Sequence, residues 1–528
     1  MAEPARTVST WGPMRFAVFR ALWIAVLVSN IGGYMQTVGA QWLLVNQAHA
    51  AILVALVTTA DMLPDMLFGL VGGVLADIFD RRRLLIAVQL GMAAVAIALA
   101  VLTFAGAIPP ALLLTFTFVL GFSSVLSNPA YQSLTPELAP PHQQRAAAEL
   151  STISLNLARA VGPALAGLFI AQQGVAFVFA LNALTYVFFG LVVVAWRPKT
   201  RLTPELPEHF ISALRAGGRF VLNSRITRRA LLRTVVFVLP ASVLWALLPL
   251  VATQRLGLGA SGYGLLLGAV GIGAVLGALI LSRLHRHLSD FAIVVASGAV
   301  VGVALALLVM VPSTIGAVLL LLPAGAGWMV VLSVVNARLE LFLPAWIRAR
   351  GLSVFQMFLF GAQAMGAVLW GVVADVLGVV PAFLIAALAL LIGVASFRFW
   401  PFFDISELDT RTVPIWPEPE LVIDPEANGG PVVIENIYSI ASANEQAFLD
   451  AMSHLRRSRM RTGATWWGLF RVGEKGHKFV EMFSMPSWEE HVRQHRYRIT
   501  GRDATFDARA RELSDPPSRT SHLIAVDR

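Results

Sequence analysis

The stretch GVLADIFDRRR, residues 73–83, is a short charged segment between two long apolar runs. The run before it covers about residues 52–76, and the run after it covers about residues 84–105. Each run is long enough to cross a bilayer as a helix. The segment therefore predicts two membrane-spanning helices joined by a tight charged turn at one membrane surface.

The composition extends this interpretation to most of the chain. Of the 528 residues, 57% are hydrophobic and only 13% are charged, whereas soluble domains carry about 25% charged residues. The net charge of +9 falls largely in short segments between apolar runs, so we expect it to set topology and expect no nucleic-acid partner. The absence of cysteine excludes disulfides and thiolate ligands, and we expect no metal and no cofactor.

Apolar runs recur between residues 16 and 400 and predict an all-α polytopic membrane protein. The first run is too long for the apolar part of a cleavable signal peptide, so none is expected. Twelve transmembrane helices are predicted, near residues 16–45, 51–76, 84–105, 110–131, 149–172, 175–196, 231–253, 261–282, 291–311, 314–336, 352–374 and 379–400.

The turns between these helices differ strongly in charge. One set of alternate turns carries nearly all the arginines, including Arg81, Arg82 and Arg83, whereas the other set has only Arg255. Cytoplasmic loops are enriched in Lys and Arg. We therefore expect a multi-pass membrane protein with both termini and the central loop in the cytoplasm.

The two groups of six helices echo each other. Residues 72–76 (GGVLA) match residues 273–277 (GAVLG), and residues 160–167 match residues 364–371 at nearly the same separation. The predicted division is 1–200, an N-terminal six-helix half; 201–230, a cytoplasmic loop with an amphipathic helix near residues 210–216; 231–400, a C-terminal six-helix half; 401–430, a linker; and 431–528, a cytoplasmic domain.

The charged turn resembles the signature loop of the major facilitator superfamily, in which Gly73, Asp77, Arg81 and Arg82 match the motif. Ile78 and Asp80 depart from it. The resemblance implies two six-helix halves with substrate held between them near the membrane midplane. It also implies that Asp77 caps the start of helix eleven, near residues 351–353, when the transporter faces outward. The corresponding turn of the second half has Leu281 in place of the Asp, so this latch would be one-sided.

Helix five contains Gly162, Pro163 and Gly167, a pattern that resembles the motif of drug:proton antiporters. The alternative is ordinary small-residue packing between helices. Arg159 lies about ten residues into the same span, about 15 Å deep. A guanidinium at that depth is costly on a lipid face, so we expect it to face a cavity or a partner.

Asp65 and Asp61 lie one turn apart in helix two, and Asp65 is about 18 Å from the charged turn. Intramembrane charges are functional candidates, and burial favours the protonated form of a carboxylate. We therefore interpret Asp65, Asp61 and Arg159 as proton-coupling residues, with Asp65 the stronger choice. The alternatives are a structural ion pair and, for Asp61, a position at the periplasmic rim.

A polar stripe along helix one is expected to line the cavity, unless it faces another helix instead. The expected lining residues are Asn30, Tyr34, Thr37 and Gln41 of this stripe, with Asn128 in helix four, Trp245 in helix seven and Asn336 in helix ten.

Residues 431–528 show a βαββαβ pattern, which predicts a ferredoxin-like α+β domain. Strands are expected at 432–440, 465–471, 478–485 and 522–526, and helices at 445–457 and 488–513. The second helix resembles that of antibiotic-biosynthesis-monooxygenase-like domains. The resemblance implies sheet-mediated dimers and, in some members, chemistry using Trp488, His491 or His495 and Asn436; a purely structural or dimerising role is the alternative.

The whole chain resembles the major-facilitator branch of the enterobactin exporter and the transmembrane secretion effectors. That resemblance implies a secondary active, proton-coupled exporter of a siderophore-like or amphipathic small molecule in the inner membrane of a bacterial cell, with no enzymatic activity in the membrane part. No nucleotide-binding Gly-rich loop with Lys and Ser/Thr is present. The alternatives are an uptake symporter of the same fold and a membrane-tethered enzyme whose C-terminal domain acts on the cargo.

Overall fold

The computed structural model describes residues 11–526 apart from 133, 135–137, 197–217, 400–410, 412, 414–420, 423–425 and 427–428. For residues 73, 74, 76–78 and 345 it describes the backbone alone. The expected amphipathic helix near 210–216 lies outside the described residues. The chain divides into two compact units. The first comprises residues 1–203, 232–335 and 354–401, and the second comprises residues 204–231, 336–353 and 402–528.

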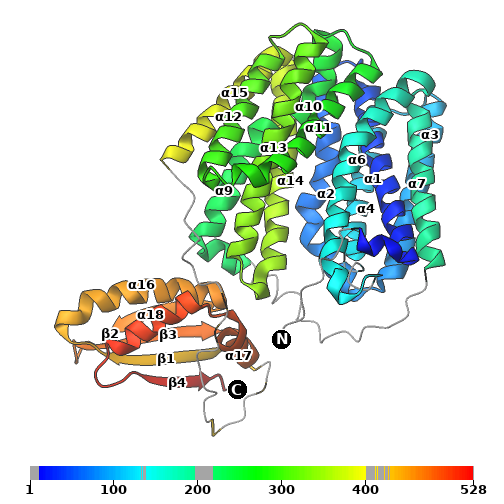
Figure 1. Cartoon of the computed structure of the whole chain (residues 1–528). Coiled ribbons are helices and arrows are strands. Elements are labelled where there is room, and N and C mark those ends of the chain that lie inside the picture. Colours follow the sequence, from blue (N-terminus) through cyan, green and yellow to red (C-terminus); the bar gives the residue numbers. More distant parts are fainter. Residues whose placement is uncertain are drawn as a thin grey trace, which may run out of the picture. The chain divides into compact units, whose positions relative to one another are not determined.

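Twelve helical segments of the described chain are long and apolar enough to cross a membrane, which confirms the predicted all-α polytopic fold. Those of the first half are α1 (Ala17–Leu44), α2 (Ala50–Ile78), α3 (Arg81–Phe104), α4 (Pro110–Gln132), α6 (Gln144–Gln173) and α7 (Val175–Ala195), shown from blue to cyan-green in Figure 1. Short 3-10 helices at Gly12–Arg15 and Pro141–Gln143 precede α1 and α6.

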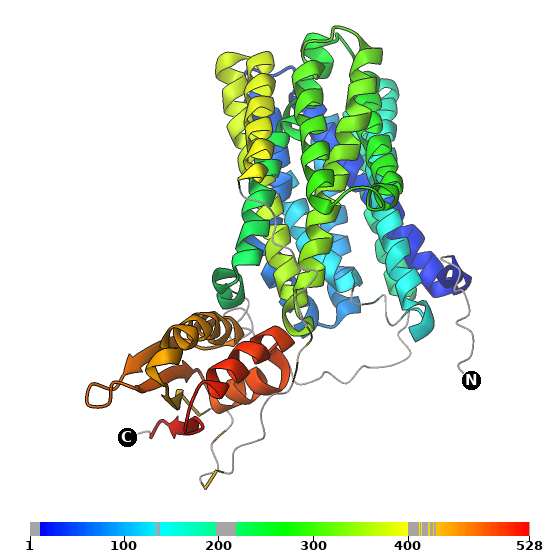
Figure 2. The same ribbon diagram turned by 60° about the vertical axis from the view of Figure 1, so that its left-hand side comes forward.

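The second half follows the same plan. Its helices are α9 (Arg225–Ala241) with α10 (Val243–Leu250) and a π-helical turn (Val251–Arg255), then α11 (Ala260–Leu284), α12 (Asp290–Leu308), α13 (Thr314–Phe342), α14 (Ala345–Leu377) and α15 (Val379–Ala395). Figures 1 and 2 show these helices running side by side along a common direction. A 3-10 turn at Ser396–Arg398 closes α15.

Several boundaries differ from the predicted ones. Helix two continues through Asp77 to Ile78, so Asp77 belongs to the helix and not to the turn. Helix seven begins at Arg225 instead of 231, and helix eleven begins at Ala345 instead of 352. Arginines are good helix formers, so the charged ends of these spans can remain helical beyond the apolar run.

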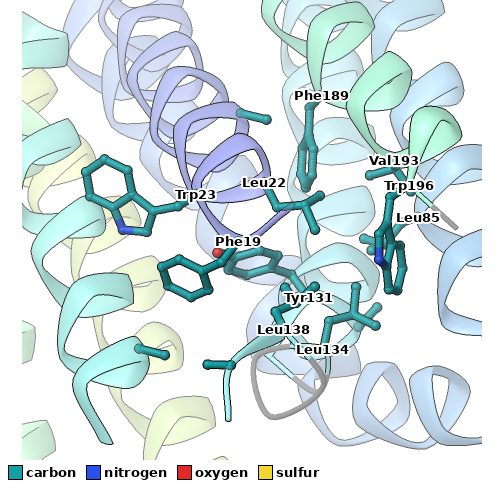
Figure 3. Close-up of a cluster of buried hydrophobic side chains, with 14 of the residues drawn as sticks. Phe19, Leu22, Trp23, Leu85, Tyr131, Leu134, Leu138, Phe189, Val193 and Trp196 are labelled. Carbon is teal, nitrogen blue, oxygen red and sulfur yellow. The ribbon is translucent and has the colours of Figure 1, made fainter. Parts of the chain in front are cut away.

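A buried aromatic cluster joins α1 to α3, α4 and α7 (Figure 3). Phe19 and Trp23 come from α1, Tyr131 from α4 and Phe189 from α7. Tyr131 and Phe189 pack edge to face with their ring centroids 6.4 Å apart. The Trp23 indole N–H donates to the carbonyl of Leu150 at 2.8 Å, which also ties α6 to this cluster.

The C-terminal part of the second unit contains a four-stranded antiparallel sheet in the order β2-β3-β1-β4. The strands are β1 (Val432–Ser439), β2 (Trp466–Arg471), β3 (Lys478–Met485) and β4 (Arg519–Ile524). A 3-10 turn (Ser442–Asn444) leads into α16 (Glu445–Thr462). With β1 and β3 in the middle, this sheet has the strand order of the expected ferredoxin-like domain.

The predicted helix 488–513 is interrupted. It consists of α17 (Trp488–Arg493), a π-helical turn (Gln494–Arg498) and α18 (Gly501–Glu512). Thr500 starts α18 because its hydroxyl accepts from the Asp503 backbone N–H while the Asp503 carboxylate accepts from the Thr500 backbone N–H, a capping box. Part of the expected linker is also ordered, since the Val413 N–H donates to the Ile499 carbonyl at 3.0 Å.

Candidate transport site

The polar stripe of α1 meets ionisable residues of two neighbouring helices. The Thr37 hydroxyl donates to Asp61 of α2 at 3.4 Å. The Arg159 guanidinium of α6 donates to the Tyr34 hydroxyl at 3.1 Å. All four side chains are partly buried within the first unit. The stripe therefore places a carboxylate and a guanidinium on adjacent polar residues of a single helix inside an apolar bundle.

Asp61 and Asp65 flank Pro64, which lies inside α2. Proline has no backbone N–H, so the carbonyl of Ala60 loses its usual partner within the helix. Gly121 of α4 packs against this point, because a Cβ there would lie 2.8 Å from the Asp61 carbonyl oxygen. The local packing thus holds α2 and α4 close together beside the two carboxylates, and Arg159 bonds to Tyr34 instead of to Asp65.

Gln41 lies further along the stripe and joins the two six-helix halves. Its amide N–H groups donate to the Thr58 hydroxyl and to the Trp245 carbonyl, each at 3.1 Å. Its amide oxygen accepts from the Tyr263 hydroxyl at 2.5 Å. Gln41 is 4% exposed, so it bridges helices here and does not present an open surface.

A second contact between the halves runs along α2 and α14. The His49 ring nitrogen lies 2.8 Å from the Asp375 carboxylate at the end of these helices. The Thr59 hydroxyl donates to the Ala364 carbonyl at 3.1 Å. Gly371 allows the backbones to approach, since a Cβ at that position would lie 2.6 Å from the Ala55 methyl group.

The small residues of helix five form the third contact. A Cβ on Gly167 would lie 2.6 Å from the Ala260 carbonyl oxygen and 2.8 Å from the Gly264 Cα. A Cβ on Gly162 would lie 2.8 Å from the Tyr34 Cβ, inside the first half. Substitution at either glycine would therefore separate helices. The Gly-Pro pattern thus lies where α6 touches both α1 and α11, with Pro163 inside the helix.

The remaining expected lining residues are placed as follows. Trp245 packs edge to face on Trp328 with centroids 5.8 Å apart, and its buried indole N–H has no hydrogen-bond partner among the described residues. Asn30 is half-buried and Asn128 is exposed. Asn336 belongs to the second unit.

The signature turn shows two local interactions. The Asp80 carboxylate accepts from the Arg83 backbone N–H at 2.8 Å and so caps α3. Arg82 donates to the carbonyls of Val193 and Val194 at 3.2 and 2.6 Å, at the C-terminal end of α7. For Gly73 and Asp77 the structure describes the backbone alone. Arg81 starts α3.

Sequence reasoning missed Thr58, Tyr263, His49 and Asp375. His49, Tyr263 and Asp375 are single polar residues near the ends of apolar helices, and nothing in their spacing distinguishes them from residues at a membrane surface. Thr58 is an uncharged residue beside Thr59 inside α2, and no pattern singles it out. The repeat did place Gly371 opposite Gly167 in the sequence alignment of the halves, but not against Ala55.

The C-terminal domain brings together a cluster of histidine and tryptophan rings. The His491 ring lies 4.8 Å from His495, 5.2 Å from His522 and 5.5 Å from Trp488, measured between centroids. Burial, together with the neighbouring imidazoles and Arg459, lowers the pKa of His491 to about 2. The His491 imidazole is therefore neutral at physiological pH. No group of three metal-binding side chains occurs in the part of the chain that the structure describes.

Asn436 belongs instead to a buried polar network. It donates to Glu481 at 2.8 Å and accepts from the Thr520 hydroxyl at 2.6 Å. Glu481 also accepts from Trp467 at 2.9 Å and from Arg459 at 3.4 Å. A carboxylate with this many donors is well satisfied, as buried charges require. The network is thus suited to holding sheet and helices together.

Two six-helix halves with close interhelical glycines and intramembrane charges define a polytopic transporter fold. The family described as "Transmembrane secretion effector" matches residues 8–528. The chain belongs to this family of the major facilitator superfamily.

Several curated relatives match part of the chain. A staphyloferrin A transporter of Staphylococcus aureus is 27% identical over 33% of this chain and 44% of its own length. The multidrug efflux pump Tap of Mycobacterium tuberculosis is 30% identical over 39% and 51%. The macrolide efflux protein A of Streptococcus pyogenes is 24% identical over 44% and 58%. The chain thus spans about half the length of the relatives it matches.

Solved structures support the fold. A bacterial homologue of the human lysosomal transporter Spinster covers 76% of this chain and 97% of its own, with a TM-score of 0.58 and 14% identity. The nucleoside transporter NupG covers 73% and 100%, with a TM-score of 0.59 and 13% identity. These identities are low, so the likeness is one of fold.

Proposed function

We propose that the chain is a secondary active exporter that couples proton entry to the release of a siderophore-like or amphipathic small molecule. The observation that carries the proposal is the polar stripe of α1, which contacts Asp61 through Thr37 and Arg159 through Tyr34. Charges in the apolar part of a membrane protein are costly and mark substrate or proton pathways. The efflux pumps and the siderophore transporter among the relatives favour export.

In this proposal Asp65 and Asp61 take up and release the proton. A carboxylate removed from water favours its neutral form, and the second carboxylate one turn away adds to this preference by repulsion. Arg159 supplies a fixed positive charge near the α1 stripe. Asn30, Asn128, Trp245 and Asn336 remain proposed lining residues for the substrate.

The proposal also includes alternating access. The contacts at Gln41, at His49–Asp375 and at Gly167 lie at the helix ends opposite the arginine-rich turns, which we assign to the periplasmic side by the positive-inside rule. We infer that these contacts form the closed outer gate of an inward-facing state. The latch formed by Asp77 at the end of α2 would form in the opposite, outward-facing state.

The test is the direction of flux. Inverted membrane vesicles that contain the protein should accumulate a siderophore or dye substrate when the vesicle interior is acidified, because the vesicle interior corresponds to the periplasm. Vesicles with the same protein and a collapsed proton gradient serve as the control. Substrate loss from the vesicles under the same gradient would favour the uptake symporter, and flux that ignores the gradient would remove proton coupling.

We propose a dimerising role for the C-terminal domain. The helices cover the sheet face that carries Val432 and Ile434, both buried. The opposite face carries Trp466, Phe470 and Leu523, which are 47%, 48% and 48% exposed. Pairing of two such faces would remove this apolar area from water, as in the domains that this segment resembles.

Light scattering tests the dimer. Residues 431–528 should be soluble and dimeric, whereas Trp466→Glu should be monomeric, and Val526→Glu at the exposed chain end should stay dimeric. A monomeric parent domain would end this proposal.

Oxidation of a quinol or haem that is lost in His491→Ala or His495→Ala would instead support the membrane-tethered enzyme. Truncation after Asp404 should leave transport measurable.

A further inference from the structure

The second unit contains a pocket with an unusual concentration of arginine. Its volume is about 240 Å³, and its lining includes Arg225, Arg457, Arg461 and Arg502, together with His454. All the lining residues belong to this one unit. Arg225 starts α9, Arg457 and Arg461 lie one turn apart on α16, and Arg502 lies in the first turn of α18. Three elements thus direct arginines to one cavity.

The carboxylate in the described lining of this pocket is already paired with an arginine. Among the described lining residues, Asp503 alone carries a carboxylate. Asp503 lies 2.5 Å from Arg461 and also accepts from the Thr500 hydroxyl at 2.7 Å. Burial raises the pKa of Asp503, but the adjacent Arg461 guanidinium lowers it. Together with hydrogen bonds to the carboxylate, this guanidinium holds the pKa of Asp503 below its usual value. The other three arginines therefore face the cavity with no second carboxylate in its lining.

His454 is a titratable residue beside these arginines, and their positive charge affects its pKa. The Arg457 guanidinium donates to the Nδ1 atom of His454 at 3.0 Å. Burial, followed by Arg457 and Arg502, lowers the pKa of His454, so that its ring is neutral and accepts this bond. The field of nearby Arg225, Arg461 and Arg502 likewise adds to burial in lowering the pKa of Arg457. The cavity is thus a site where an anion would be stabilised.

An apolar recess adjoins the basic pocket. The recess has a volume of about 650 Å³ and shares Asn223, Arg225 and Arg457 with the first pocket. It adds Arg228 and Arg456, and its remaining lining is largely apolar, as with Met452 and Met460. A molecule with an anionic group and an apolar portion would fill both spaces.

The pocket lies at the ends of membrane spans. Arg225 is the first residue of the span Arg225–Arg255, and Phe342, which also lines the pocket, is the last residue of the span Thr314–Phe342. Arginines at such ends serve membrane topology. That role does not explain Arg457, Arg461 and Arg502, because they belong to the α+β domain and follow the last span.

We propose that this pocket binds a phosphate-bearing anion, either the headgroup of an anionic phospholipid or a free phosphate compound. Guanidinium groups match the oxygens of a phosphate in pairs and remain charged when partly desolvated. The occupied site would hold together the parts of the second unit that line the pocket, namely residues 220–226, residues 342–344, α16 and α18, through one ligand. The proposal does not depend on the direction of transport.

The test uses the purified full-length protein and two probes. In the first arm the protein is placed in nanodiscs of phosphatidylcholine with or without phosphatidylglycerol. The midpoint temperature of unfolding is measured, and native mass spectrometry records which lipid is retained. In the second arm inorganic phosphate is titrated into the protein in neutral detergent. A ligand that binds the folded state raises the midpoint. A response to phosphatidylglycerol alone identifies a lipid headgroup, and a response to phosphate identifies a free anion.

The variant Arg457→Gln/Arg502→Gln should lower the affinity for the responding probe about tenfold or more, because it removes two charge-assisted interactions. The matched control Arg471→Gln/Arg509→Gln removes two exposed arginines of the same domain that do not line the pocket, and it should bind as the parent does. The variant Arg457→Lys/Arg502→Lys keeps the charge and should regain part of the affinity, which separates lost binding from lost folding. Equal responses of the two Gln pairs, or no response to either probe, would overturn the proposal.

Discussion

At the scale of single residues, the decisive feature is the placing of a few polar groups among apolar ones. Thr37 and Tyr34 of one helix hold Asp61 and Arg159 of two others. Each of these residues was identifiable from its type and depth in a span. The contacts between these residues could not be predicted from the sequence. Whether a hydroxyl meets a carboxylate on another helix depends on how each helix is rotated about its axis.

The first prediction concerns the carboxylates. Asp65→Asn should abolish proton-driven efflux while the protein remains folded and in the membrane, because the amide cannot take up or release a proton. Asp61→Asn should reduce efflux less. Flux in proteoliposomes at several values of pH measures both. Normal pH-dependent flux in Asp65→Asn would remove Asp65 from the coupling mechanism, and the exposed Asp450→Asn variant controls for a general effect of lost charge.

At the scale of elements, helix ends decide how the segments connect. The signature turn is closed by Asp80 at α3 and by Arg82 at the end of α7. In the C-terminal domain the capping box of Thr500 and Asp503 begins α18. The sequence pattern suggested one long helix there, since helical periodicity continues through the break and a single threonine is a weak start signal.

The second prediction tests the proposed latch at Asp77, near the end of α2. Asp77→Asn should shift the resting protein toward the inward-facing state and slow transport more than it weakens substrate binding. A negative charge at a helix N-terminus contributes roughly 0.3–1 kcal/mol, or about 2 kcal/mol when partly buried. The N-terminus in question is that of α14, which begins at Ala345. Reporter cysteines near Gln254 should become less accessible from outside; unchanged accessibility would contradict the latch.

The third prediction tests the helix break. Thr500→Val should lower the free energy of unfolding of the segment 405–528 by about 0.5–2 kcal/mol, the usual cost of a lost N-cap. Urea denaturation followed by circular dichroism measures this value. Thr505→Val, at an exposed position in α18, should change stability by less than about 0.5 kcal/mol. Equal effects of the two substitutions would show that the capping box does not stabilise α18.

At the scale of the whole molecule, the membrane and the aqueous surroundings impose different rules on the two kinds of domain. The spans are largely apolar and carry only a few polar groups, whereas the C-terminal domain has a sheet with one face buried under helices, a histidine cluster and ionic networks. Because its buried histidines are neutral when folded, the stability of the C-terminal domain should depend on pH.

The fourth prediction concerns this pH dependence. Burial lowers the pKa of His491 to about 2 and of His495 to about 3, while both titrate near 6.5 when unfolded. The unfolded chain thus binds more protons below pH 6.5, so the folded domain should lose about 1–2 kcal/mol per histidine between pH 7 and pH 5. Denaturation of residues 405–528 at both values measures the loss. His491→Phe should flatten the dependence and the exposed His477→Gln should not; a parent domain of constant stability would refute the buried neutral state.

The fifth prediction concerns topology. A cysteine at Gln254 should react with an impermeant thiol reagent in intact cells, and a cysteine at Arg82 should react only after the membrane is opened. The chain has no cysteine of its own, so each label reports one position. Labelling of position 82 in intact cells would reverse the proposed orientation.

The sequence by itself determined the twelve spans, the repeat of the halves, the four strands and the ionisable residues within the bundle. A bilayer makes these features local, because every span must satisfy its own backbone and present an apolar surface. Only the tertiary structure decided that Gln41 bonds to Tyr263 and Trp245, that His49 meets Asp375, and that arginines of α9, α16 and α18 share a pocket. These pairings depend on the rotation and packing of elements distant in sequence, and no local pattern of residues specifies that geometry.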